Sequence, residues 1–77
     1  NIQPQDVFAV RDGHAALAVG NDGQFAKLCE ALGHPEWARD PRFARNADRV
    51  RNEAELTPLL AARLVDFTRA ELTGLLD

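Results

Sequence analysis

The residues best able to perform covalent chemistry are one cysteine and two histidines. Cys29 could act as a nucleophile with His14 or His34 as its base. Cys29, however, lies at helical spacing from apolar neighbours, and a free cysteine on such a stripe is usually a small buried side chain. His14 follows a turn glycine and His34 precedes a proline, so both are expected at turns or on the surface. Their irregular spacing is also poor for zinc. We therefore predict no catalytic residue and no metal among them.

The acidic residues occupy positions where carboxylates usually stabilise turns and helix ends. Asp12 belongs to an Asp-Gly turn, Asp22 and Asp40 are predicted to cap helices, and Glu55 and Glu71 complete capping boxes. No two acids have a spacing that suggests general acid–base catalysis. The chain also has no serine, no Gly-rich nucleotide-binding motif and no Cys-x-x-Cys pair. A serine nucleophile and the common phosphate and redox motifs are therefore excluded.

One segment is rich in arginine: Arg39, Arg42, Arg45, Arg49 and Arg51. With two aspartates between them, these residues give the segment 39–51 a net charge of +3. It could bind phosphate from a cofactor or a nucleic acid, pair with acids of a neighbouring domain, or form a solvated face. No aromatic residues alternate with the arginines as in single-strand binders. We favour a structural role and assign no cofactor-binding residue.

Composition narrows the classes of partner. A 45% hydrophobic and 27% charged composition is ordinary for a globular protein, and 77 residues allow one small domain, 1–77. The net charge of −3 argues against a nucleic-acid module, and no apolar run approaches the ~20 residues of a membrane helix. We therefore expect neither a nucleic acid nor a membrane as partner.

The single cysteine and the missing methionine concern the protein's context. One cysteine cannot form an internal disulfide, which fits a reducing compartment, and we expect a cytoplasmic protein. A complete translation product starts with methionine, so we expect the chain to be part of a longer one.

The order of the segments predicts an α+β fold. Residues 1–6 form an incoming loop, residues 7–19 an antiparallel β-hairpin, and residues 21–77 a helical part with three to five short helices. Gly13 follows Asp12 between two apolar runs and can adopt the positive φ that a tight turn requires. Both faces of the second strand are nearly apolar, so we expect both to be covered, one of them by a neighbouring domain.

Helical spacing and capping signals divide the remaining residues. The first helix has one apolar stripe, formed by Phe25, Leu28, Cys29 and Leu32. A later helix contains Pro58, so it must start near Thr57 or bend there. The last helix has no stop signal before the end of the chain, and its inward residues are Leu72, Leu75 and Leu76. The expected caps are Asn21 or Asp22, Asn46, Asn52 with Glu55, and Thr68 with Glu71.

The succession of short motifs resembles the family III CoA-transferases, which include formyl-CoA transferase, the carnitine dehydratase and bile-acid-inducible F proteins, and α-methylacyl-CoA racemase. The matching N-terminal motifs are Phe8, Asp12-Gly13, Leu17 to Asp22 and Gln24-Phe25. Those that follow are Leu32-Gly33, Pro35-Glu36, Asp40 to Phe43, Arg45 to Val50 and Asn52 to Leu56. The sequence departs from the family pattern at Gln5, His14 and Pro58.

The resemblance implies an acyl-CoA enzyme. Members transfer CoA between carboxylic acids through an aspartyl-CoA thioester, and their catalytic aspartate and most CoA contacts belong to a large Rossmann-like domain. This chain resembles the small domain, so no catalytic residue maps onto it. The resemblance also implies an interlocked homodimer, with CoA or acyl-CoA as substrate and no metal.

Two alternatives remain open from sequence. The first is an acyl-CoA racemase or dehydratase of the same superfamily. The second is a stand-alone helical interaction or DNA-binding module that uses residues 46–77, against which the acidic net charge and the hairpin both argue.

Overall fold

A two-residue turn at Arg11 and Asp12 folds the start of the chain into an antiparallel hairpin. The computed structural model describes residues 1–76. Strand β1 (Gln5–Val10) pairs with strand β2 (Gly13–Ala18). Gly13 has a φ of 139°, in the region that glycine enters far more easily than other residues. The predicted hairpin is therefore confirmed, with the turn glycine in the expected role.

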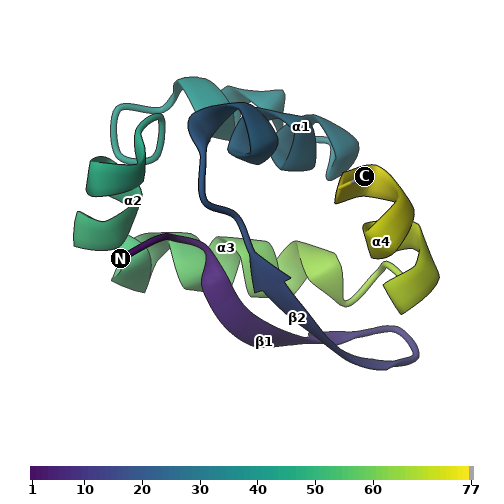
Figure 1. Ribbon diagram of the computed structural model, residues 1–77. Coiled ribbons are helices and arrows are strands. Elements are labelled where there is room, and N and C mark those ends of the chain that lie inside the picture. Colours follow the sequence, from purple (N-terminus) through teal and green to yellow (C-terminus); the bar gives the residue numbers. More distant parts are fainter. Residues whose placement is uncertain (77) are drawn as a thin grey trace.

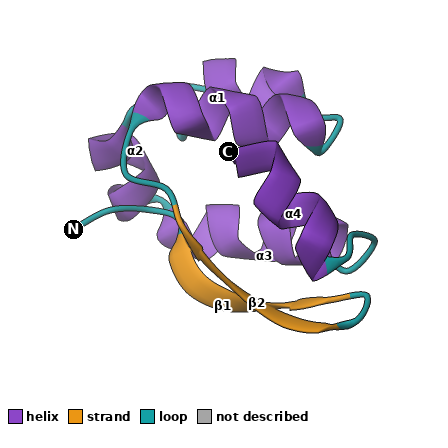
Figure 2. Ribbon diagram, turned by 45° about the vertical axis from the view of Figure 1, so that its right-hand side comes forward, coloured by secondary structure: helices purple, strands orange, loops and turns teal. Residues whose placement is uncertain are grey.

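Helices and one 3-10 turn make up the rest of the described chain. They are α1 (Asp22–Ala31), the 3-10 helix η1 (Pro35–Arg39), α2 (Asn46–Arg51), α3 (Glu53–Leu64) and α4 (Arg69–Leu76). The hairpin lies against α3, α1 lies across the opposite side, and α2 and α4 close the two ends (Figures 1 and 2). The predicted α+β class is confirmed. Within residues 1–76, no helix has both the length and the apolar character needed to cross a bilayer.

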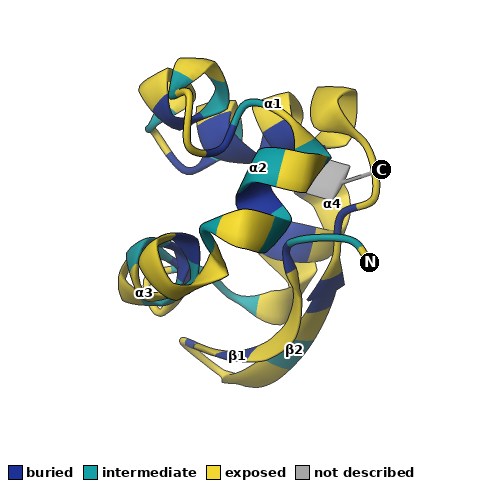
Figure 3. Ribbon diagram, turned by 90° about the vertical axis from the view of Figure 1, so that its left-hand side faces the viewer, coloured by how far each residue is buried: buried dark blue, intermediate teal, exposed yellow. Residues whose placement is uncertain are grey.

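The space between the hairpin, α1 and α3 is filled by one apolar core. Its members are Phe8, Val10, Leu17, Val19, Phe25, Leu28, Cys29, Leu32, Trp37, Phe43, Leu56, Leu60, Leu64 and Leu72. The predicted α1 stripe is buried in full, and the buried parts of the ribbon face inward from every element (Figure 3). The prediction that Leu75 and Leu76 point inward concerns side chains outside those described.

Two of the predicted caps form as expected. The Asn21 side chain accepts a hydrogen bond from the Gln24 amide at 2.8 Å, at the start of α1. At α4, the Thr68 hydroxyl accepts from the Glu71 amide at 3.1 Å, and the Glu71 carboxylate accepts from the Thr68 amide at 2.8 Å. This reciprocal pair satisfies two backbone donors that a helix start otherwise leaves free.

The predicted cap at Asn46 is wrong, whereas Asn52 occupies the predicted N-cap position of α3 without the expected side-chain bond. Asn46 is the first residue of α2, and its side chain accepts from the Gln3 amide and donates to the Asn1 carbonyl. The Asn52 side chain makes no cap bond and instead donates to the Arg42 carbonyl. Both side chains hydrogen-bond to distant backbone groups instead of capping the start of a helix.

Helix α3 begins before Pro58 and continues through it. It starts at Glu53 and contains Pro58, so a start near Thr57 is wrong. The α3 ribbon is continuous in Figure 1. Pro58 cannot donate a hydrogen bond to the carbonyl of Ala54. Both residues are exposed, so water can satisfy that carbonyl, which limits the cost of the proline.

The two faces of the hairpin differ in cover. Leu17 and Val19 are buried as predicted, whereas His14, Ala16 and Ala18 are exposed. The described residues therefore cover one face only, and the expected cover of the other face by a neighbouring domain stays a prediction. The second face, with His14, Ala16 and Ala18 on β2, is exposed in the described part of the chain.

Candidate functional site

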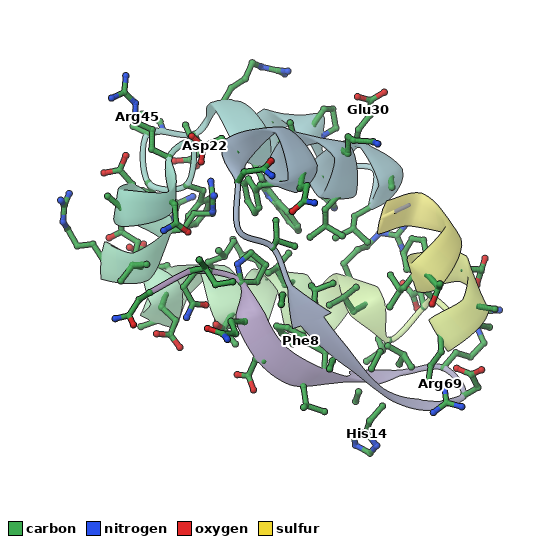
Figure 4. The ribbon with its side chains drawn as sticks, in the orientation of Figure 1. Phe8, His14, Asp22, Glu30, Arg45 and Arg69 are labelled. Atoms are coloured by element: carbon green, nitrogen blue, oxygen red, sulfur yellow. The ribbon has the colours of Figure 1, made fainter. Side chains whose placement is uncertain are left out.

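The three candidate catalytic side chains lie on different parts of the fold. Cys29 is completely buried inside α1. His14 lies on the exposed face of β2 and points away from the core (Figure 4). His34 lies in the turn between α1 and η1, where its ring stacks on Trp37. Among residues 1–76, no group of three or more histidine, cysteine or acidic side chains could hold a metal ion.

Burial makes Cys29 a poor nucleophile. It raises the pKa of the Cys29 thiol to about 12. The thiolate is the reactive form of cysteine, so almost none of it is present near neutral pH. The prediction that Cys29 is a structural residue agrees with this environment.

The His34 turn is a feature that sequence reasoning missed. The rings of His34 and Trp37 lie 4.2 Å apart and 3° from parallel. The Nδ1 atom of His34 lies 2.8 Å from Oε2 of Glu36, and this bond holds the pKa of Glu36 below its ordinary value. The rings border a shallow pocket of about 240 Å³ whose other walls come from α3, including Leu59 and Arg63. The only available signal was the spacing of His34 and Trp37, three residues apart across a predicted turn.

Arg49 is a core residue rather than part of a basic surface. Its side chain is 0% exposed. Nε donates to the Gln3 carbonyl at 2.8 Å, one Nη to the Phe43 carbonyl at 2.8 Å, and the other Nη to Asp22 Oδ1 at 2.9 Å. The guanidinium also lies 4.4 Å from the centre of the Phe25 ring. These contacts supply the partners that a buried cation requires.

The other arginines of segment 39–51 divide into two groups. Arg42 pairs with Asp40 at 2.8 Å and with Glu55 at 3.1 Å, and Arg51 pairs with Asp48 at 3.2 Å. Arg39 and Arg45 are exposed and form no ion pair within residues 1–76. Three of the five guanidinium groups thus have partners inside the chain. The structural interpretation of this segment is the one that the geometry favours.

The acids stabilise the fold, but three of them do so differently from the prediction. Asp22 lies inside the first turn of α1 and accepts from the Asn46 amide at 3.0 Å, at the start of α2. Asp40 caps no helix start, because residues 41–45 form turns and bends, and its carboxylate accepts from the Arg42 amide and guanidinium. Glu55 binds Arg42 and completes no capping box. In each case a guanidinium or a distant amide is the partner.

Asp12 and its neighbour join the hairpin turn to the start of α4. The Asp12 carboxylate accepts from the Arg69 amide at 3.0 Å, and the Arg11 amide donates to the Phe67 carbonyl at 2.8 Å. The Arg11 guanidinium also donates to the Asp66 carbonyl. The turn residues therefore have a structural role, as expected for Asp12. Within residues 1–76 the geometry assembles no set of groups suited to covalent chemistry.

Comparison with known proteins identifies the family and the relatives of this chain. The family model for CoA-transferase family III matches residues 1–77. A succinate–glutarate CoA-transferase of Agrobacterium fabrum is 39% identical over 94% of this chain and 18% of its own length. A succinyl-CoA–D-citramalate CoA-transferase of Chloroflexus aurantiacus is 36% identical over 100% of this chain and 19% of its own. The chain thus spans about a fifth of the length of these relatives.

Solved structures give the same picture. A CAIB/BAIF family protein from Brucella suis matches 99% of this chain with a TM-score of 0.92 and 47% identity, over 20% of its own chain. The protein Rv3272 from M. tuberculosis matches 97% with a TM-score of 0.86 and 36% identity, over 21% of its own chain. The fold is therefore that of a small part of a larger protein.

Thiol labelling tests the environment of Cys29. In the native chain at pH 8, Cys29 should react with a disulfide reagent at least about 100-fold more slowly than in denaturant, because burial removes the thiolate. As a control, a Val65→Cys variant in a Cys29→Ala background places the thiol at an exposed position and should react rapidly in both states. Rapid labelling of native Cys29 would contradict a buried, inert thiol.

The stability of the chain should fall in acid. The His34 side chain, the Arg42 guanidinium and the Thr68 amide lower the pKa of Glu36, Asp40 and Glu71, respectively. A carboxyl group with a lowered folded pKa stabilises the fold above its unfolded pKa, and this contribution is lost as pH falls through the folded value. The free energy of unfolding, measured with urea from pH 7 to pH 3, should therefore decline below about pH 4.5, the ordinary value for glutamate.

Two glutamine variants check the cause of that decline. Glu71→Gln keeps an acceptor for the Thr68 amide but cannot titrate, so its acid loss should be smaller than that of the unmodified chain. Glu30→Gln, at a side chain that points to solvent (Figure 4), should retain the full loss. Equal profiles for all three proteins would rule out a contribution from Glu71.

Removal of the Arg49 guanidinium should be severely destabilising. Arg49→Met leaves the Gln3 and Phe43 carbonyls without their donor, and the expected loss is about 2–4 kcal/mol of unfolding free energy. Arg45→Met, at an exposed side chain, should change it by less than about 0.5 kcal/mol. Urea denaturation of both variants measures the difference. Similar losses in the two would show that the buried contacts contribute little.

Proposed function

The chain belongs to CoA-transferase family III, and we propose that the longer protein of which it is the small domain transfers CoA between carboxylic acids. The family match over residues 1–77 carries this proposal. The curated relatives support it, because their names describe transfer of CoA between succinate and glutarate or D-citramalate, and between acetyl-CoA and oxalate. Dicarboxylic acids are therefore the first acceptors to test.

We assign the covalent steps to residues outside this chain. In the proposed reaction an aspartate of the large domain attacks the acyl-CoA thioester, which gives a mixed anhydride and free CoA. The CoA thiolate then attacks the aspartyl carbonyl, which gives an aspartyl-CoA thioester and releases the donor acid. The acceptor carboxylate attacks this thioester, and the released CoA attacks the acceptor carbonyl of the new anhydride, which gives the new acyl-CoA and regenerates the aspartate. Such covalent catalysis divides one acyl transfer into easier steps. In residues 1–76 the thiol is buried and the acids Asp12, Asp22 and Asp40 accept structural hydrogen bonds. The role of the small domain is then to pack against the rest of the protein, and we assign most of the CoA contacts to the large domain.

The assembly and location of the whole protein are part of the same proposal. We place it in the cytoplasm as an interlocked homodimer of two-domain chains, each with a large Rossmann-like domain. The resemblance to the family supports the dimer and the large domain, and a single buried cysteine suits a reducing compartment. A racemase or dehydratase of the same superfamily would act on acyl-CoA without a second acid, and the reaction products distinguish it.

A transfer assay on two proteins tests the proposal. The full-length protein should move CoA from succinyl-CoA or acetyl-CoA to glutarate, D-citramalate or oxalate, with each new CoA thioester identified by mass spectrometry. The 77-residue chain alone should form none, because it lacks the proposed nucleophile. Epimerised or dehydrated acyl-CoA without transfer would favour the superfamily alternatives. CoA exchange catalysed by the isolated chain would overturn the assignment of the nucleophile.

A further inference from the structure

The face of the hairpin turned away from the core is apolar and exposed. We call it the hairpin outer face and define it by Val7, Ala9, Ala16 and Ala18. The register places Val7 opposite Ala16, and Ala9 opposite His14. Side chains opposite each other in an antiparallel pair point to the same face, so these residues form one surface. All four are exposed, and Val7 is 61% exposed, the highest value for a large hydrophobic residue in the described chain.

The composition of this face suits close packing. Three of its four members are alanines, which let an opposing surface approach the strands closely. Its two end positions, Gln5 and His14, carry no permanent charge. A strand with one buried and one solvated face normally alternates apolar and polar residues. In β2, by contrast, every position from Ala15 to Ala18 is apolar. This pattern is typical of a strand that is covered on both faces.

A pocket adjoins the hairpin outer face. It has a volume of about 370 Å³, and β2 and α4 supply its walls, among them His14, Ala16, Arg69, Leu72 and Thr73. Ala16 belongs to both the face and the pocket, and His14, at the end of the face, also lines the pocket. The pocket lies beside β2, which within residues 1–76 pairs only with β1. A strand with one partner presents unpaired backbone donors and acceptors along its other edge. The face and the pocket thus form a continuous surface with apolar and backbone features.

We propose that this surface is where the remaining part of the same polypeptide packs, through an apolar and largely uncharged surface of its own. The relatives support this occupant, because the chain matches only 18–19% of the length of the Agrobacterium fabrum and Chloroflexus aurantiacus relatives. It matches 20% of the Brucella suis structure. A covalently attached domain meets this face at a high effective concentration, which a separate partner lacks. The inference depends on the chain being a small domain and not on the reaction of the enzyme.

The proposed contact also explains how a hairpin that the chain covers on one face only is stabilised. A two-stranded hairpin is marginally stable in water unless another element packs on it. Here α3 and α1 cover one face only. Packing of the large domain on the other face would complete a layer on each side of the strands. A second copy of the chain is the rival occupant. Cross-linking from position 7, in dimers refolded from a mixture of isotopically labelled and unlabelled chains, separates contacts within one chain from contacts between two chains.

Carbene footprinting of the full-length protein tests the proposal without any substitution. Val7 should be labelled as weakly as its buried neighbour Phe8, which is 4% exposed. Labelling of Val7 several-fold above Phe8, as its exposure in this chain implies, would overturn the proposal. Protection of Val7 together with cross-links from position 7 that join only labelled to unlabelled chains would assign the face to a second copy and would equally overturn it. Because footprinting needs no turnover, its outcome is independent of the transfer assay.

Matched substitutions in the full-length protein give a second test. Val7→Glu and Ala16→Arg should lower its melting temperature by several degrees, because each introduces a charge into a packed interface. Val65→Glu and Ala26→Arg alter exposed positions outside the face and should leave the melting temperature within about 1 °C of the unmodified protein. Losses of equal size in both pairs would contradict an interface specific to the hairpin outer face.

Discussion

The buried guanidinium of Arg49 is the interaction on which the arrangement of the chain depends most. It binds the incoming segment at Gln3, the turn at Phe43 and helix α1 at Asp22, and it lies over Phe25. A buried cation is costly unless its donors are all paired. Its three partners come together only when the N-terminal segment, α1 and α2 are in their native places. Arg49 therefore favours one relative placement of these segments over others that would bury a similar apolar area.

A second set of polar contacts acts at the opposite end of the fold. There the hairpin turn binds the connection between α3 and α4 through Arg11 and Asp12. The apolar core lies between these two ends (Figure 1). Apolar packing is not directional, so it tolerates several orientations of hairpin and helices. The hydrogen bonds at both ends define the orientation, while the core supplies most of the driving force.

Features that depend on near neighbours could be predicted from the sequence. The Asp12-Gly13 turn, the α1 stripe and the Thr68–Glu71 box each need partners within four residues, so spacing alone identifies them. The roles of Asn46 and Arg49 could not be predicted in this way. The partners of the Asn46 side chain are Gln3 and Asn1, at sequence separations of 43 and 45. Arg49 binds Asp22 at a sequence separation of 27. Nothing in the local sequence distinguishes Arg49 from the four other arginines of its segment.

The same division between local and distant partners limits what this domain can do chemically. Several of its carboxylates accept structural hydrogen bonds. Asp22 accepts from Asn46 and Arg49, Asp40 from Arg42, and Asp12 from the start of α4. A carboxylate whose oxygens accept structural hydrogen bonds has fewer lone pairs available to act as a nucleophile or base. The hairpin outer face, in contrast, consists of apolar side chains that form no such hydrogen bonds. Under the proposal made above, this domain contributes to the longer protein through the surface on which it packs and not through reactive side chains of its own.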